Sequence, residues 1–168
     1  FFLTVIFDLT VAIEVGLVIA CVLFMKRVME TTEISVITDE IDPNKESDIA
    51  VHEENLMIPK GIEVYEINGP YFFGIATKFE ETMTQLGDRP KVRIIRMRKV
   101  PFIDSTGIHN LTTLCEMSQK EKTTVILSGV NENVHNVLEK AGFYELLGKE
   151  NICPNINVAL ERAKSLVK

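Results

Sequence analysis

The 168-residue sequence has no tryptophan, only three cysteines and three histidines, and no Lys or Arg before residue 26. The cysteines Cys21, Cys115 and Cys153 lie far apart and form no CxxC pair, which excludes a disulfide framework and is typical of buried thiols in a reducing compartment. The histidines lack any metal-ligand spacing such as HExxH. We therefore expect no metal and no cofactor.

The charge balance excludes another class of function. The chain carries a net charge of −6 at pH 7. Nucleic-acid-binding proteins need a basic surface that neutralises phosphates, and an acidic chain does not supply one. We expect no nucleic acid among the partners.

The first 27 residues differ from the rest in composition. The run from Phe1 to Met25 is apolar apart from two acids, and Lys26 and Arg27 follow it directly. A helix of this length rises about 1.5 Å per residue, enough to cross a bilayer core of about 30 Å, and basic residues mark the cytosolic end of a span. The pattern favours a transmembrane helix over 1–27, with the rest in the cytoplasm. Neither the core helix of a soluble protein nor a cleaved signal peptide fits as well.

The two acids of this span are Asp8 and Glu14. They are six residues apart, which puts them about 240° apart around a helix, so they do not share a face. A carboxylate at membrane depth is costly and normally faces other helices or water. A place in an ion pathway and a packing role beside neighbouring helices both stay open. The sequence does not start with Met, so we expect a piece of a longer multi-pass protein.

After a linker over 28–32, strand-like and helix-like patterns follow one another through 33–168. Period-two or continuous apolar runs predict strands, and apolar residues at helical spacing predict helices. We expect strands over 33–38, 61–67, 71–73, 91–100 and 123–128, and helices over 76–86, 108–115, 134–141 and 156–167. The order predicts an α/β fold with a mixed sheet, right-handed crossovers and helices mainly on one face.

An acidic segment over 39–60 interrupts the soluble part after its first strand. Seven acids lie between Asp39 and Asn55, together with Pro43 and Asn44. This composition predicts a solvated, variable loop. The ligand order of an EF-hand is missing, which argues against a calcium loop.

Two polar loops follow neighbouring predicted strands. The first is Asp104–Gly107, which includes Ser105 and Thr106, and the second begins at Ser128 and Gly129. A helix start presents free N–H groups and partial positive charge, so it can hold an anion or a phosphorylated hydroxyl; the simpler interpretation is that Asp104 or Ser105 caps the helix. Carboxyl ends of parallel strands share one edge of a sheet, where ligands of open α/β sheets bind.

Chemistry beyond binding has little support in these loops. Neither matches GxGxxG or GxxxxGK[ST], so nucleotide binding remains an open alternative without a motif. No nucleophile elbow is present, and no sequence motif pairs a His with a Ser or Cys as a catalytic group. We therefore expect no enzymatic activity and no catalytic residue.

The run Val100-Pro101-Phe102-Ile103-Asp104-Ser105-Thr106-Gly107 resembles the signature of STAS domains, which occur in sulfate transporters and in anti-sigma factor antagonists. The stretch from Leu127 to Phe143 is similar to the second half of that fold. Both Ile67–Gly74 and Asp8–Gly16 resemble the transporter branch, the latter as the last transmembrane helix of SulP anion transporters.

The resemblance implies a regulatory and interaction module of a secondary-active transporter for sulfate, bicarbonate or dicarboxylates. It implies three kinds of partner: the rest of the membrane domain, a second copy in a dimeric transporter, and cytosolic regulators. In the antagonists the serine equivalent to Ser105 is phosphorylated, so a phosphorylation-controlled partner switch is the alternative function. The Ser105 and Ser128–Gly129 loops are the expected regulatory surface.

Overall fold

The computed structural model describes residues 8–30, 33–37, 40–41, 56–71 and 90–167. They belong to two compact units, 1–32 and 33–168. The predicted helix over 76–86 and most of the acidic segment lie outside the described residues.

In the first unit, the described residues form the helix α2 (Leu9–Glu30). Its stretch from Leu9 to Arg27 has a mean hydropathy of 2.2 and is long and apolar enough to cross a membrane. Asp8 lies at the start of this helix, where its Oδ1 accepts a 2.7 Å hydrogen bond from the N–H of Leu9, whereas Glu14 lies within it. Asp8 is therefore at one end of the described helix, which is where a carboxylate is least costly.

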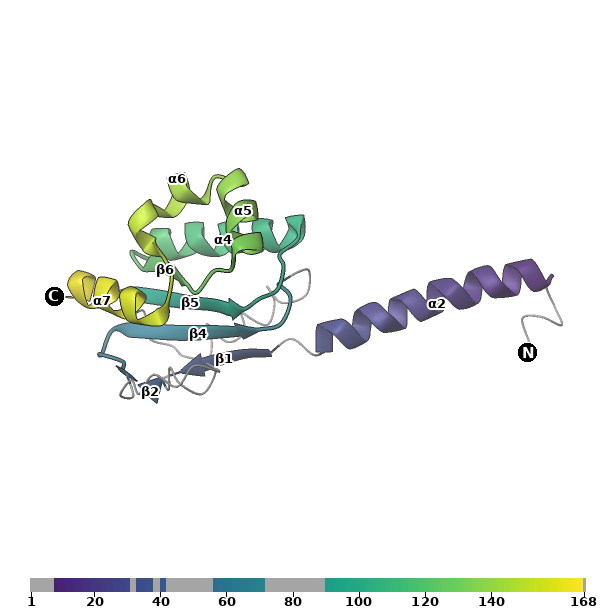
Figure 1. Ribbon diagram of the computed structural model, residues 1–168, viewed down its shortest axis with the longest axis horizontal. Helices are drawn as coiled ribbons and strands as arrows, with labels where there is room; N and C mark the ends of the chain where they lie inside the picture. Colours follow the sequence, from purple (N-terminus) through teal and green to yellow (C-terminus); the bar gives the residue numbers. More distant parts are fainter. Residues whose placement is uncertain (1–7, 31–32, 38–39, 42–55, 72–89, 168) are drawn as a thin grey trace. The chain divides into compact units, whose positions relative to one another are not determined.

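The second unit is built on a five-stranded sheet of order β1-β4-β5-β6-β7 (Figure 1). Antiparallel β1 (Glu33–Ile37) pairs with β4 (Ile62–Asn68), and the remaining pairs are parallel. They add β5 (Val92–Lys99), β6 (Thr124–Ser128) and β7 (Ile152–Cys153). This is the mixed sheet expected from the sequence.

A second, two-stranded sheet lies within the acidic segment. It pairs β2 (Glu40–Ile41) with β3 (Leu56–Met57), antiparallel. The composition of this segment predicted a loop throughout. The structure differs from that prediction, because the two ends of the segment pair with each other.

Helices cover both faces of the large sheet, unequally. Three of them, α4 (Ser105–Lys120), α5 (Glu132–Lys140) and α6 (Phe143–Leu147), lie together on one face (Figure 1). The opposite face packs against α7 (Ile156–Val167). A short 3-10 turn, η1 (Lys149–Asn151), leads into β7. Among the described helices, most are on one face, as predicted.

Alternation along the strands divides the core into two clusters. Ile95 and Met97 of β5 face the α4 side, where they join Leu111 and Leu138. Val92 and Ile94 face the α7 side with Ile126, Ala159 and Leu160. Each fully buried aliphatic side chain contributes about 1.5–3 kcal/mol relative to exposure, so both clusters are needed to hold the sheet.

A buried polar network sits within the α4 face. Arg93 Nη1 donates a 2.8 Å hydrogen bond to Ser118 Oγ, and its Nη2 lies 3.7 Å from Glu63 Oε2. Tyr65 Oη donates to the same carboxylate at 2.8 Å. Burial, more than the neighbouring carboxylate, raises the pKa of Tyr65. The network gives both Nη groups of the buried guanidinium a partner, whereas its Nε has none among the described residues.

Candidate functional site

Asp104 caps the helix that follows the first polar loop. Its backbone is extended, with φ −96° and ψ 178°, and its Oδ1 accepts a 2.7 Å hydrogen bond from the N–H of Gly107. This is the N-cap arrangement, in which a side-chain oxygen satisfies one of the N–H groups that the first turn leaves without a helical acceptor. Of the two caps that the sequence allowed, the structure has Asp104.

Ser105 is the first residue of α4, and both it and Thr106 are exposed. Because Asp104 supplies the cap, the Ser105 hydroxyl is not needed for it. The serine is therefore accessible from solvent at the positive end of a 16-residue helix.

Gly107 is buried and closely packed. A Cβ at this position would lie 2.3 Å from the carbonyl oxygen of Tyr71 and 2.8 Å from Ile103 Cγ1. Tyr71 and Ile103 form a parallel bridge here, and the N–H of Tyr71 donates to the carbonyl of Phe102. Glycine is required because the helix start passes directly against this backbone.

The second polar loop leaves β6 at Ser128. This serine is fully buried, whereas Gly129 adopts a positive φ of +68°. The N–H of Gly129 donates a 3.0 Å hydrogen bond to the carbonyl of Cys153, which ties the loop to β7. A Cβ on Gly129 would lie 3.2 Å from Arg98 Cβ, so the glycine also permits a close approach to β5.

The two loops are joined by Asn131. Its side chain accepts a 2.9 Å hydrogen bond from the N–H of Val134, which caps α5, and its Nδ2 donates to the carbonyl of Val100. The contact links the segment after β6 to the segment after β5. The loops do meet at one edge of the sheet, through Asn131 rather than through the predicted serines.

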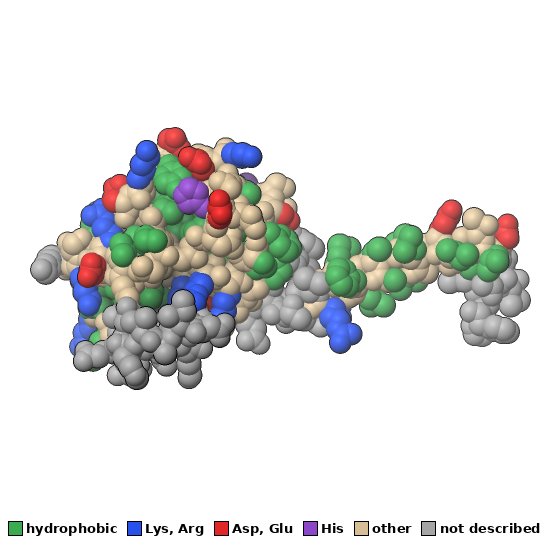
Figure 2. All heavy atoms as spheres, viewed as in Figure 1, with side chains coloured by type: hydrophobic (Ala, Val, Ile, Leu, Met, Phe, Trp, Pro, Cys, Tyr) green, Lys and Arg blue, Asp and Glu red, His purple; other side chains and the backbone are tan. Residues whose placement is uncertain are grey.

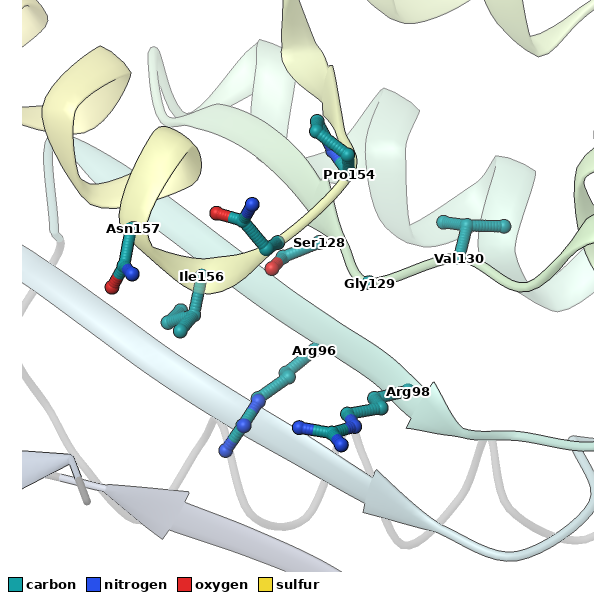
Figure 3. Close-up of a pocket in the computed structure, with 9 residues that line it drawn as sticks. Arg96, Arg98, Ser128, Gly129, Val130, Pro154, Ile156 and Asn157 are labelled. Atoms are coloured by element: carbon teal, nitrogen blue, oxygen red, sulfur yellow. The ribbon is translucent and has the colours of Figure 1, made fainter. Parts of the chain in front are cut away.

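A cavity of about 350 Å³ opens beside the second loop, on the α7 side of the sheet (Figure 3). Ser128 and Gly129 line it together with Val130, the two β5 arginines and the segment that begins α7. The lining residues are Arg96, Arg98, Ser128, Gly129, Val130, Pro154, Asn155, Ile156 and Asn157. Its volume lies in the range of small-molecule sites.

The walls of the cavity come from strand β5 and from the start of α7. Arg96 and Arg98 are two residues apart on β5, so they point to the same face. Arg96 is only 4% exposed, and its Nη1 lies 3.1 Å from Glu66 Oε1, an ion-pair distance at which the groups are not aligned for a hydrogen bond. Arg98 is exposed. Asn155 accepts a 3.0 Å hydrogen bond from the N–H of Val158 and so holds the first turn of α7.

Only one of the two predicted loops lines this cavity. Ser128 and Gly129 line the cavity, whereas the stretch Asp104–Gly107 does not. Sequence reasoning missed Arg96 and Arg98, although their spacing within a predicted strand already placed them on one face.

In the part of the chain that the structure describes, the remaining His and Cys side chains lie apart from this cavity. Within the described ranges no group of three or more His, Cys, Asp or Glu side chains could hold a metal ion. Burial raises the pKa of the Cys115 thiol to about 12, which leaves it a protonated core side chain. His135 and Tyr144 form a hydrogen bond to each other between α5 and α6.

Comparisons with known proteins agree with this architecture. A family model for the STAS domain matches residues 55–159. The putative sulfate transporter YvdB of Bacillus subtilis is 28% identical over 152 residues, which cover 90% of this chain and 27% of that protein. The chain spans about a quarter of the length of the curated relatives it matches.

Two solved structures are more similar in sequence. A sulfate transporter family protein from Wolinella succinogenes is 41% identical with a TM-score of 0.64, and the match covers 76% of this chain and 98% of that one. The STAS domain of a SulP transporter from Vibrio cholerae is 35% identical with a TM-score of 0.60, covering 66% and 87%. The chain therefore belongs to the STAS domain family, in the branch of the sulfate transporters.

Proposed function

We propose that this chain joins a transmembrane helix to a cytosolic STAS domain that regulates and helps to assemble a secondary-active transporter of inorganic anions or dicarboxylates. One observation carries the proposal: an apolar helix leads, after only Thr31 and Thr32, into the first strand of a STAS domain. Transport itself belongs to the larger part of the relatives that this chain does not cover.

The surface of α2 supports the membrane assignment. Apolar side chains are exposed around it, including Ile13 at 63%, Leu17 at 64% and Phe24 at 69% (Figure 2). In water this surface would be costly, whereas a lipid bilayer or other transmembrane helices would cover it. Lys26 and Arg27 lie near the C-terminal end of the helix, before the chain continues into the STAS domain, which agrees with the positive-inside rule for a cytosolic domain.

Glu14 supports a partner within the membrane. It is exposed in the second turn of α2, where contact with lipid would be unfavourable. We infer that it faces the remaining helices of the transporter or a water-filled space between them.

Topology is the direct test of this proposal. Lys140 is exposed at the end of α5, while Cys115 and Cys153 are buried, so Lys140→Cys in a Cys21→Ser background offers a single accessible thiol within this chain. A membrane-impermeant maleimide should label it in inside-out vesicles and not in sealed right-side-out vesicles. Labelling in right-side-out vesicles would refute the cytosolic position of the domain. Recovery of the parent protein in the soluble fraction without detergent would refute the membrane assignment.

Uptake by vesicles that contain the intact transporter tests the substrate class. Radiolabelled sulfate, bicarbonate and a dicarboxylate are the probes, each against empty vesicles. If none of them accumulates above the level in empty vesicles, the proposal that the protein is a transporter of these anions is refuted.

Chemical cross-linking of the same preparation tests the proposed dimer, which should appear at twice the monomer mass.

A second function is favoured by the exposure of Ser105. Phosphorylation would add about −1.5 to −2 charge at the first turn of α4. The partial positive charge at the start of the helix would attract this phosphate, whereas the Asp104 carboxylate would repel it. This would change which cytosolic partner docks there. Uptake and surface level should differ between Ser105→Asp and Ser105→Ala in the full transporter, with Ser165→Asp as a control on α7. If both Ser105 variants match the wild type, the serine only begins the helix.

A further inference from the structure

We propose that the cavity between β5, β6 and the start of α7 binds a tetrahedral oxyanion group, either a free dianion such as sulfate or phosphate or the phosphate of a small metabolite. The cavity is the one described above, lined by Arg96, Arg98 and Ser128 (Figure 3). The site is distinct from the Ser105 loop, and it goes beyond the regulatory role proposed for the domain as a whole.

The first argument is charge. Among the described residues that line the cavity, two carry positive charge and none carries negative charge. Arg96 is nearly buried and is held in place by Glu66, whereas Arg98 is exposed at the mouth. Guanidinium groups on one face of a strand are suited to bind two oxygens of the same anion.

The second argument is the helix start. The first turn of α7, at Ile156 and Asn157, lines the cavity, and Asn155 caps it by accepting from the N–H of Val158. In Figure 3 this turn lies across the cavity from the two arginines. A 12-residue helix places partial positive charge at this end, which favours an anion there.

The third argument is independent of charge. Ser128 is fully buried, and its Oγ has no hydrogen-bond partner among the described residues. A buried hydroxyl without a partner costs free energy, so it requires an explanation. Its oxygen points into the space between Ile156 and Arg96 (Figure 3), where it can donate to an anion oxygen.

The fourth argument concerns the backbone. Gly129 brings the loop close to Arg98, because its positive φ and missing side chain allow Arg98 Cβ to approach. Asn155 holds the opposite wall by capping α7. Both walls are therefore fixed by local structure before any ligand arrives, which lowers the entropy cost of binding.

The test uses the full chain in detergent micelles or nanodiscs, with the amide signals of Gly129 and Asn157 followed by NMR. The probes are sulfate, inorganic phosphate and glycerol 3-phosphate, each titrated at constant ionic strength against chloride. We expect saturable shifts at both amides. Equal response to the two free dianions identifies a free anion as the ligand, and preference for the ester identifies a phosphorylated metabolite. Shifts that do not saturate, or that chloride reproduces, would overturn the proposal.

Variants distinguish anion binding in this cavity from a general effect of the domain's positive charges. Arg98→Gln should weaken binding about tenfold or more, because a charge-assisted hydrogen bond is lost, and Arg98→Lys should recover part of it. Lys164→Gln removes the same charge from the exposed last turn of α7 and should leave binding unchanged. Ser128→Ala should weaken binding about threefold while the domain stays folded. Equal losses in Arg98→Gln and Lys164→Gln would refute the site.

This experiment is independent of the test of transport. If uptake and topology are as proposed but no probe binds, only the anion site fails. If a probe binds and the parent protein is soluble, the site stands and the transporter assignment fails.

Discussion

Replacement of Gly107 by alanine tests how tightly the start of α4 is packed. The added methyl group would lie 2.3 Å from the carbonyl oxygen of Tyr71, 2.8 Å from Ile103 Cγ1 and 3.0 Å from Tyr71 Cδ1. The first of these is a backbone atom in a parallel bridge, so it cannot move without breaking that bridge. Either the loop or the helix start must shift.

The size of the effect follows from two opposing terms. Overpacking of a closed site costs about 1–3 kcal/mol, and a clash with backbone lies at the upper end of that range. Alanine in place of glycine in a helix returns about 1 kcal/mol of intrinsic propensity. The net loss is about 2 kcal/mol, which lowers the melting temperature by about 6–10 °C for a domain of this size.

Thermal unfolding of the full chain in detergent, followed by circular dichroism, measures the loss. Gly16→Ala is the matched control, because it adds the same methyl group to a helix where nothing lies within 4 Å. It should leave the transition of the STAS domain unchanged. A melting temperature of Gly107→Ala equal to that of the wild type would refute the steric argument.

Three further predictions concern single contacts. Asp104→Ala should lower the free energy of unfolding by about 1 kcal/mol, and Asp104→Asn should lower it by much less because asparagine also caps helices. Equal losses for the two variants in denaturant titrations would show that Asp104 does not act as a cap. Ser118→Ala removes the acceptor of the Arg93 hydrogen bond and should lower the free energy of unfolding by about 1–3 kcal/mol. The control Ser165→Ala, at an exposed position, should change it by almost nothing, and equal losses in the two variants would contradict the buried network. Stability should fall above pH 9, the ordinary pKa of a cysteine thiol, because the unfolded chain releases the Cys115 proton while burial holds the folded pKa at about 12. Above pH 9 the folded state therefore binds more protons than the unfolded state, and the free energy of unfolding falls by up to about 1.4 kcal/mol per pH unit. Cys115→Ala should remove that part of the pH dependence.

Long periodic segments of the fold were predictable from the sequence, and short ones were not. The apolar run before Ser128 and the stretch Lys91–Val100 were sufficient to predict β6 and β5. β7 has two residues, and α6 has five, so neither is long enough to show a period. They exist because tertiary contacts with β6 and the α4 face stabilise them.

The candidate site shows the same limit at the level of side chains. Ser128 and Gly129 were identified because a polar loop after a buried strand is visible in the sequence. The cavity also needs Pro154–Asn157, which the chain brings back only through β7. Since β7 could not be predicted, the opposite wall of the cavity could not be either. The role of Asp104 as the cap, by contrast, was one of two options that the sequence already offered.

The place of α7 in the chain has a consequence for biosynthesis. Val64 and Ile94 of the central strands are fully buried, and they share their core cluster with Ile156, Ala159 and Leu160 of α7. Strands β4, β5 and β6 leave the ribosome well before this helix, so one apolar face of the nascent sheet stays uncovered until residues 156–163 emerge. A ribosome stalled before that point would hold an aggregation-prone intermediate, and the cell's chaperones would have to shield this face in particular.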